Sequence, residues 1–127
     1  MKIISGYLKN KNLILPKDKY TRPLKSIVRE SIFNILEHSR LFSFKIKDSN
    51  ILDLFSGVGS FGLECISRGA KKVFFYENYK PSSIILKKNI HKLNCNKNTM
   101  VFEENIYNKN IFKILKEKKF EIIYLDP

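Results

Sequence analysis

The chain has 127 residues, and its 24 Lys and Arg against 12 Asp and Glu give a formal net charge of +12. This length predicts one domain, and a hydrophobic content of 43% excludes an intrinsically disordered chain. No apolar run is long enough to cross a membrane, and residues 1–6 lack the apolar segment of a secretory signal. Cys65 and Cys95, with only two histidines, predict neither a disulfide framework nor a metal site. We therefore expect a monomeric cytoplasmic protein.

The positive charge is concentrated near the start of the sequence. Residues 1–25 contain seven basic side chains and a single acid, Asp18. Lysine, isoleucine and asparagine all have A/T-rich codons and together make up 49 residues, so part of the lysine excess can be compositional drift. The alternative is a polyanionic partner, because clustered lysines neutralise phosphates. The uneven distribution favours nucleic acid, and residues 1–24 are predicted to be a basic RNA-contacting segment.

Residues 1–20 contain two short apolar runs, Ile3-Ile4 and Leu13-Ile14-Leu15, which predict extended pieces. Arg22-Pro23 then interrupts the chain, because the residue before a proline is disfavoured in helices. An amphipathic helix is expected over 25–38, with Ser26 as a candidate N-cap. The residues that recur at helical spacing there are Ile27, Val28, Ser31, Ile32, Ile35 and Leu36.

From Asn50 onward, predicted strands alternate with predicted helices. The strands are expected at 51–55, 72–77, 100–102 and 120–125, and the helices at 60–69, 81–94 and 108–118. The second of these helices carries Ile84, Ile85, Lys88 and His91 at three-to-four spacing, and the third is expected to bury Ile111, Ile114 and Leu115. This alternation predicts βαβ units and an α/β fold with a parallel sheet. The fourth predicted strand runs directly into the last residues of the sequence. Residues 25–127 are therefore expected to be a partial domain of a longer chain.

A glycine-rich turn follows the first predicted strand of the sheet. Gly57, Gly59 and Gly62 form a G-x-G-x-x-G pattern between a strand and a helix, which is the context of a nucleotide-binding turn. Alone, this triplet is weak evidence and is also compatible with an ordinary turn. Asp53 lies four residues before Gly57, and Glu77 ends the second strand, where an acid typically binds ribose hydroxyls. A carboxylate in a buried strand is costly unless it is satisfied, so Asp53 is the stronger indication.

Polar side chains also follow the third and fourth predicted strands. Asn105 is placed where a side-chain amide can pair with an adenine edge, although a turn asparagine is an equally simple interpretation. Asp126-Pro127 brings a carboxylate to the carboxyl end of the fourth strand, where it can accept hydrogen bonds from a base amine. An ordinary strand-ending turn is the alternative here.

The order of these residues favours one nucleoside cofactor over another. A nicotinamide-binding turn does not require an acid four residues before its first glycine. Asp53 and Glu77 together favour a ligand that has both an ammonium group and a ribose, which S-adenosylmethionine provides. A nicotinamide-dependent oxidoreductase stays as an alternative, but it leaves Asp126-Pro127 unexplained.

These residues resemble the class I S-adenosylmethionine-dependent methyltransferases. Within that class, the chain is similar to the RsmD family of bacterial 16S rRNA guanine-N2 methyltransferases. The segments that carry the resemblance are Thr21-Arg22-Pro23, Val28 to Leu36, Leu52 to Gly57 and Asp126-Pro127. It implies a Rossmann-like methyltransferase fold and methylation of a guanine amine in the small ribosomal subunit. It also implies roles for Asp53, Phe55, Gly57, Gly59, Gly62, Glu77, Asn105 and Ile106 in cofactor binding, and for Asp126 and Pro127 in catalysis. Together with the positive charge of residues 1–25, it predicts that Lys9, Lys11, Arg22 and Arg29 bind RNA.

The sequence departs from the family at several points. Asn105 stands where the family often has aspartate, and Leu24-Lys25-Ser26 replaces a polar helix start. The family's Asp-Pro-Pro-Phe/Tyr motif is present only as Asp126-Pro127, and its last three strands have no counterpart. We therefore expect this chain alone to be poorly soluble and to transfer no methyl group. A non-catalytic RNA-binding module is the remaining alternative.

Overall fold

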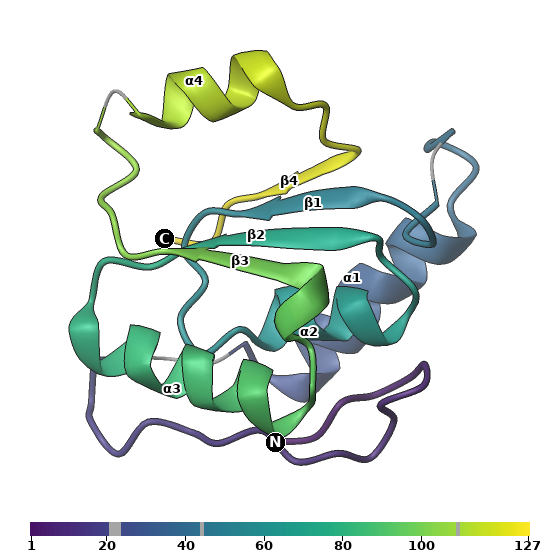
Figure 1. Cartoon of the computed structure of the whole chain (residues 1–127). Helices are drawn as coiled ribbons and strands as arrows, with labels where there is room; N and C mark the ends of the chain where they lie inside the picture. Colours follow the sequence, from purple (N-terminus) through teal and green to yellow (C-terminus); the bar gives the residue numbers. More distant parts are fainter. Residues whose placement is uncertain (21–23, 44, 109) are drawn as a thin grey trace.

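A four-stranded parallel sheet forms the centre of the molecule (Figure 1). The computed structural model describes residues 1–20, 24–43, 45–108 and 110–127. The strands are β1 (Asn50–Asp53), β2 (Lys72–Tyr76), β3 (Thr99–Phe102) and β4 (Ile122–Tyr124), in the order β3-β2-β1-β4. This confirms the predicted α/β architecture. The central strands β1 and β2 are buried by helices on both faces, as their continuous apolar runs predict, whereas the edge strands β3 and β4 are partly exposed.

Helices cover both faces of this sheet. They are α1 (Ser26–His38), α2 (Ser60–Ser67), α3 (Lys80–Lys92) and α4 (Asn110–Glu117), with a short 3-10 turn, η1, at Asn96–Asn98 that was not predicted. In Figure 1, α4 lies on one side of the sheet, and α1, α2 and α3 lie on the other. Two hydrophobic clusters match these layers. One joins Phe33 of α1 and Leu86 of α3 to the sheet, and the other contains Ile111 of α4 with Leu52 and Phe74.

The predicted helices form, but the buried face of α3 differs from the predicted one, and that of α1 agrees only at Ile32 and Leu36, which pack against the core. In α1, the buried residues are Arg29 and Phe33, while Ile27 is 72% exposed. In α3, Ile84 is half-exposed, and the buried face includes the polar residue Asn89. Asn89 is tolerated in the interior because its amide bonds the backbone of residues 14 and 58. Spacing alone could not reveal these buried polar partners.

Two smaller expectations about helix geometry also need correction. Lys25, not Ser26, occupies the N-cap position of α1, and no side-chain hydrogen bond caps this helix. In α4, Ile111 is buried but Leu115 is 39% exposed. Pro81 does lie in the first turn of α3, where its missing N–H is not needed.

The first residues of the chain pack against the α2 side of the sheet. Lys2 and Asn12 form an antiparallel bridge, and Ile3, Leu8 and Leu13 are buried in the same hydrophobic cluster as α1, α2 and α3. The extended pieces are thus part of the core, and the predicted parts 1–24 and 25–127 share one cluster.

Arg29 does not have the position that an RNA-binding residue requires. Its side chain is fully buried, 3.9 Å from the Glu64 carboxylate, and it donates a hydrogen bond to the Lys2 carbonyl. A buried guanidinium cannot reach a phosphate on the surface, so the predicted RNA contact of Arg29 is wrong. Its role in this structure is to join α1, α2 and the N-terminal segment.

Candidate functional site

The glycine turn connects β1 to α2 and brings the backbone close to the carboxyl ends of the strands. Gly59 has a φ of 90° and is the N-cap of α2, a left-handed conformation that side chains disfavour. Gly62 allows α2 to approach β2 closely, because a Cβ there would lie 2.2 Å from Phe75 Cε1. The first glycine, Gly57, donates its amide to Glu77 and lines the adjoining cavity. The turn therefore needs glycine for its shape and for helix packing.

Asp53 is a buried carboxyl group at the end of β1. It is 1% exposed, and neither carboxyl oxygen has a hydrogen-bond partner among the described residues. Burial, together with the negative charges of Glu77 and Asp126, raises the pKa of Asp53 to about 8. The Gly62 N–H opposes this rise from nearby, without hydrogen-bonding geometry to either carboxyl oxygen. Such a group is costly in the folded chain and is suited to bind a cation.

Glu77 lies across the glycine turn from Asp53 and is held in place by backbone amides. Its Oε2 accepts a 2.7 Å hydrogen bond from the Gly57 N–H, and its Oε1 accepts a 2.8 Å bond from the Tyr79 N–H. A carboxylate oxygen has more than one lone pair, so both oxygens can still accept hydrogen bonds from hydroxyl groups. The carboxylate is therefore oriented before any ligand arrives.

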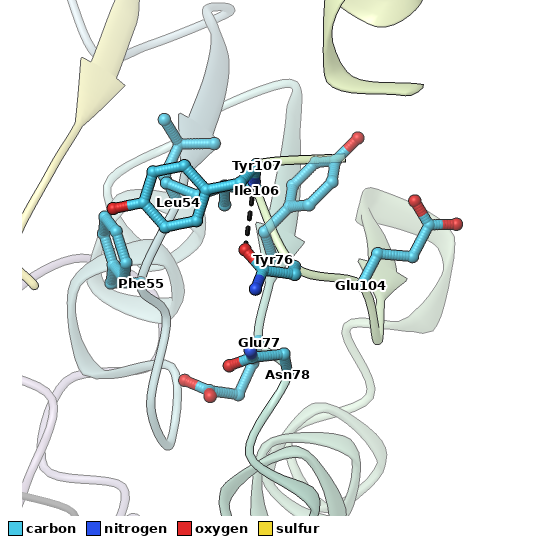
Figure 2. A pocket seen from close by; sticks show the side chains of 9 residues that line it. Leu54, Phe55, Tyr76, Glu77, Asn78, Glu104, Ile106 and Tyr107 are labelled. Carbon is cyan, nitrogen blue, oxygen red and sulfur yellow. Dashed lines mark hydrogen bonds between the residues drawn. The ribbon is translucent and has the colours of Figure 1, made fainter. Parts of the chain in front are cut away.

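A small pocket lies beyond Glu77, between the ends of β1, β2 and β3 (Figure 2). Asn105 accepts a 3.0 Å hydrogen bond from the Tyr107 N–H through its Oδ1, which leaves its amide nitrogen available as a donor. This bond is the dashed line in Figure 2. The lining combines apolar and polar side chains, as a nucleobase pocket requires. The residues that line it are Leu54, Phe55, Tyr76, Glu77, Asn78, Glu104, Asn105, Ile106 and Tyr107.

A larger cavity of about 570 Å³ adjoins this pocket and shares Phe55 and Glu77 with it. Its volume lies within the usual range for small-molecule sites. Asp126 and Pro127 form part of its wall, and the Asp126 carboxylate accepts a 3.4 Å hydrogen bond from the Tyr124 hydroxyl. The complete lining is Tyr20, Leu24, Lys25, Val28, Phe55, Gly57, Glu77, Tyr79, Ser82, Asp126 and Pro127.

Several cavity residues were not predicted from the sequence. Tyr20 and Tyr79 form an edge-to-face pair with ring centroids 6.3 Å apart, and Tyr20 is 83% exposed. Tyr79 follows Glu77 by two residues, so its position next to a predicted site residue was a usable signal. Tyr20, Leu24 and Val28 come from the N-terminal part of the chain. No local sequence pattern predicts that these residues lie beside the sheet.

Most of the predicted site residues lie together at the carboxyl ends of the strands. These are Asp53, Phe55, Gly57, Glu77, Asn105, Ile106, Asp126 and Pro127. Gly59 and Gly62 shape the turn and the packing of α2 but line neither cavity. Lys9 and Lys11 lie apart from this group, on the exposed part of the N-terminal hairpin. Arg22 lies outside the described residues.

The described residues contain neither a metal-binding cluster nor a membrane-spanning helix. No group of three or more His, Cys, Asp or Glu side chains in that part of the chain could hold a metal ion. No helix there is long and apolar enough to span a bilayer.

The parallel sheet, its strand order and the acids at its carboxyl edge define the Rossmann-like fold of the class I methyltransferases. Comparison with known proteins gives the family within this class. A family model described as "Conserved hypothetical protein 95" matches residues 1–127, and the chain belongs to this family, the RsmD family.

Curated relatives carry the name "Ribosomal RNA small subunit methyltransferase D". The protein of that name from Buchnera aphidicola (subsp. Baizongia pistaciae) is 34% identical over 129 residues, which cover 100% of this chain and 60% of the relative. The Haemophilus influenzae protein is 33% identical, over 100% of this chain and 63% of the relative. The chain thus spans about three fifths of the length of these relatives.

Solved structures are similar in fold as well as in sequence. The crystal structure of a putative methylase from Haemophilus influenzae has a TM-score of 0.67 and 31% identity, covering 100% of this chain and 64% of that one. A putative methyltransferase from Escherichia coli has a TM-score of 0.69 and 31% identity, covering 83% of this chain and 52% of that one.

Proposed function

We propose that this chain binds S-adenosylmethionine and forms the cofactor-binding part of an enzyme that methylates the exocyclic N2 amine of a guanine in 16S rRNA. The observation that carries the proposal is the Asp53 carboxyl group, which is buried without a hydrogen-bond partner among the described residues. It lies at the carboxyl end of β1, the strand that leads directly into Phe55 and Gly57 in the wall of the larger cavity. The names of the curated relatives support the ribosomal RNA substrate.

The residues present fit this cofactor. Asp53 and the glycine turn suit its ammonium group, Glu77 suits its ribose hydroxyls, and the small pocket with Asn105 and Ile106 suits its adenine. When bound, S-adenosylmethionine supplies an electrophilic methyl group. An ammonium group next to Asp53 would favour the ionised carboxylate and so lower its raised pKa.

Asp126 is proposed as the catalytic group of this chain. Its carboxylate can accept hydrogen bonds from an exocyclic amine in the larger cavity, and this would orient the nitrogen lone pair. The adjoining Pro127 restricts the backbone that carries Asp126. Because the chain spans about three fifths of its relatives, we infer that turnover also needs residues outside this match, and that this chain alone binds the cofactor without methylating RNA.

Lys9, Lys11 and Arg22 are proposed to contact RNA phosphates. Lys9 and Lys11 are exposed on the N-terminal hairpin, which Glu64 and Arg29 fix to the helices. A rigid support favours binding, because less conformational freedom is lost in the complex.

Titration calorimetry with S-adenosylmethionine and S-adenosylhomocysteine tests the cofactor assignment directly. We expect both to bind the full 127-residue chain, and Asp53→Ala and Glu77→Ala each to weaken binding by about 1.5–3 kcal/mol, the usual contribution of hydrogen bonds to charged groups. Glu117→Ala, an exposed acid at the end of α4, is the matched control and should not change the affinity.

NAD in the same titration separates the alternatives. Tighter binding of NAD than of S-adenosylmethionine would replace the proposal with an oxidoreductase. RNA binding without any binding of S-adenosylmethionine would favour a non-catalytic RNA-binding module.

A further inference from the structure

A second basic surface lies at the end of the sheet opposite to the candidate site. A hollow of about 420 Å³ opens there at the amino ends of the strands, beside Asn50 at the start of β1 and Lys72 at the start of β2. Because the strands are parallel, their amino ends and their carboxyl ends form opposite edges of the sheet (Figure 1). The hollow is therefore separate from the small pocket lined by Glu77 and from the larger cavity lined by Glu77 and Asp126.

Five lysines from three distant parts of the chain converge on this hollow. They are Lys71, Lys72, Lys97, Lys118 and Lys119. Four of them are exposed and Lys72 is half-buried, and none forms an ion pair with another described residue. The one acid in the lining, Glu121, already accepts a 2.7 Å hydrogen bond from the Asn50 N–H. That hydrogen bond leaves Glu121 negatively charged, so the hollow brings five positive charges together with one negative charge and has an excess of positive charge.

The arrangement of two of these lysines is fixed by an aromatic ring. The ammonium groups of Lys72 and Lys118 lie 5.4 Å and 5.1 Å from the centroid of the buried Phe74 ring. Each of these cation–π contacts attracts an ammonium group to the ring and so favours the observed positions of the two lysines. Compositional drift toward lysine explains exposed lysines in general, but it does not explain their convergence from 71–72, 97 and 118–119 on one hollow.

We propose that this lysine hollow is a second RNA-contacting surface, which binds phosphates of the RNA backbone. The inference rests on the proposed function, because an RNA large enough to present a guanine at the carboxyl edge of the sheet can also reach its amino edge. β2 spans only five residues, so the two edges are about 15 Å apart. Lysines bind phosphates as point charges without reading the base, so this surface would add affinity and orientation rather than sequence specificity.

Lysine footprinting on the unmodified chain tests this surface. The full chain would be acetylated with an amine-reactive ester, with and without transcribed 16S rRNA, and the modified lysines identified by mass spectrometry. We expect Lys71, Lys97 and Lys119 to be protected by RNA, while Lys88 and Lys113 on the exposed faces of α3 and α4 stay reactive. Equal protection of these three hollow lysines and the two control lysines would overturn the proposal. The absence of protection at every hollow lysine would also overturn it.

A charge-matched pair of variants provides the quantitative test. Lys71→Gln, Lys97→Gln and Lys119→Gln are combined in one chain, which leaves the two lysines over Phe74 in place, and Lys88→Gln, Lys113→Gln and Lys116→Gln are combined in the control. Each phosphate contact adds about one to the slope of log affinity against log salt concentration. We expect the hollow variant to lose about two to three from this slope and about tenfold or more in affinity at low salt, with little change in the control.

The outcomes separate this proposal from the proposed function. If both variants bind S-adenosylmethionine like the parent chain but show the same salt slope for RNA, the lysine hollow is not an RNA surface and the cofactor assignment stands. If polyglutamate binds and only its binding depends on the hollow lysines, the partner is an acidic protein and the RNA assignment is wrong. If S-adenosylmethionine fails to bind while the hollow lysines are protected by RNA, the cofactor assignment fails and the RNA surface remains.

Discussion

Asp53 has a cost to stability and, in the proposed function, a role in binding the cofactor. A carboxyl group that is buried without a hydrogen-bond partner among the described residues destabilises the fold whenever it ionises. Serine or alanine at this position would remove that cost, and also the buried acid that precedes the glycine turn. A ligand with an ammonium group converts the same carboxylate from an uncompensated charge into one half of an ion pair.

The first prediction concerns the pH dependence of stability. The pKa of Asp53 is raised from 3.8 to about 8 in the folded chain. The folded chain therefore holds this proton more tightly than the unfolded chain does. The contribution of the proton to the free energy of unfolding is complete below the unfolded pKa and is lost as the pH rises through about 8. Urea unfolding between pH 5 and 9 should show the stability of the parent chain falling relative to that of Asp53→Asn, which has no proton to lose. Parallel pH profiles of the two chains would contradict the raised pKa.

At the scale of whole elements, Glu64 joins three parts of the fold. It is buried within α2, and it accepts hydrogen bonds from the Ile4 and Ser5 amides at 2.9 and 3.0 Å. It also bonds Arg68 at 3.0 Å and lies 3.9 Å from Arg29. The N-terminal segment, α1 and α2 therefore share a single carboxylate.

The second prediction follows from this shared carboxylate. Glu64→Gln leaves Arg29 buried without a counter-charge, so we expect a loss of about 3–5 kcal/mol in the free energy of unfolding. The control is Glu37→Gln, which removes the partly exposed acid on Arg68 and should cost about 0–1 kcal/mol. Denaturant unfolding of both variants measures the difference, and equal losses would show that Glu64 is no more important than a surface acid.

The success of the sequence-based predictions also differs between elements. The four strands and the glycine turn were predictable, because a strand buried on both faces is a short apolar run and the turn requires glycine at fixed positions. The polar residues on the buried faces of α1 and α3 were not predictable, since the contacts of Arg29 with Lys2 and Glu64, and of Asn89 with Ile14 and Val58, join distant parts of the chain. The same limit applies to the site. Asp53 and Glu77 follow from their strands, whereas Tyr20 joins the cavity through tertiary packing alone.

For the molecule as a whole, the net charge of +12 is the property that most directly concerns RNA. The third prediction concerns the N-terminal hairpin, where Lys9→Gln combined with Lys11→Gln should lower the salt slope of 16S rRNA binding by about two. Fluorescence anisotropy across a range of salt concentrations measures this slope. Affinity that does not depend on salt would mean that these lysines reflect codon composition and bind no phosphate.

The attachment of the N-terminal hairpin to α2 and α3 has a consequence for the order of events during protein synthesis. The amides of Ser5 and Ile14 bond side chains that lie 59 and 75 residues further along the chain. At about 5–20 residues per second, translation delivers those partners several seconds after the hairpin has left the ribosome. Ile3, Leu8 and Leu13 therefore lack their native partners during this interval, and this early-made segment can reach its native position only after α2 and α3 have been synthesised.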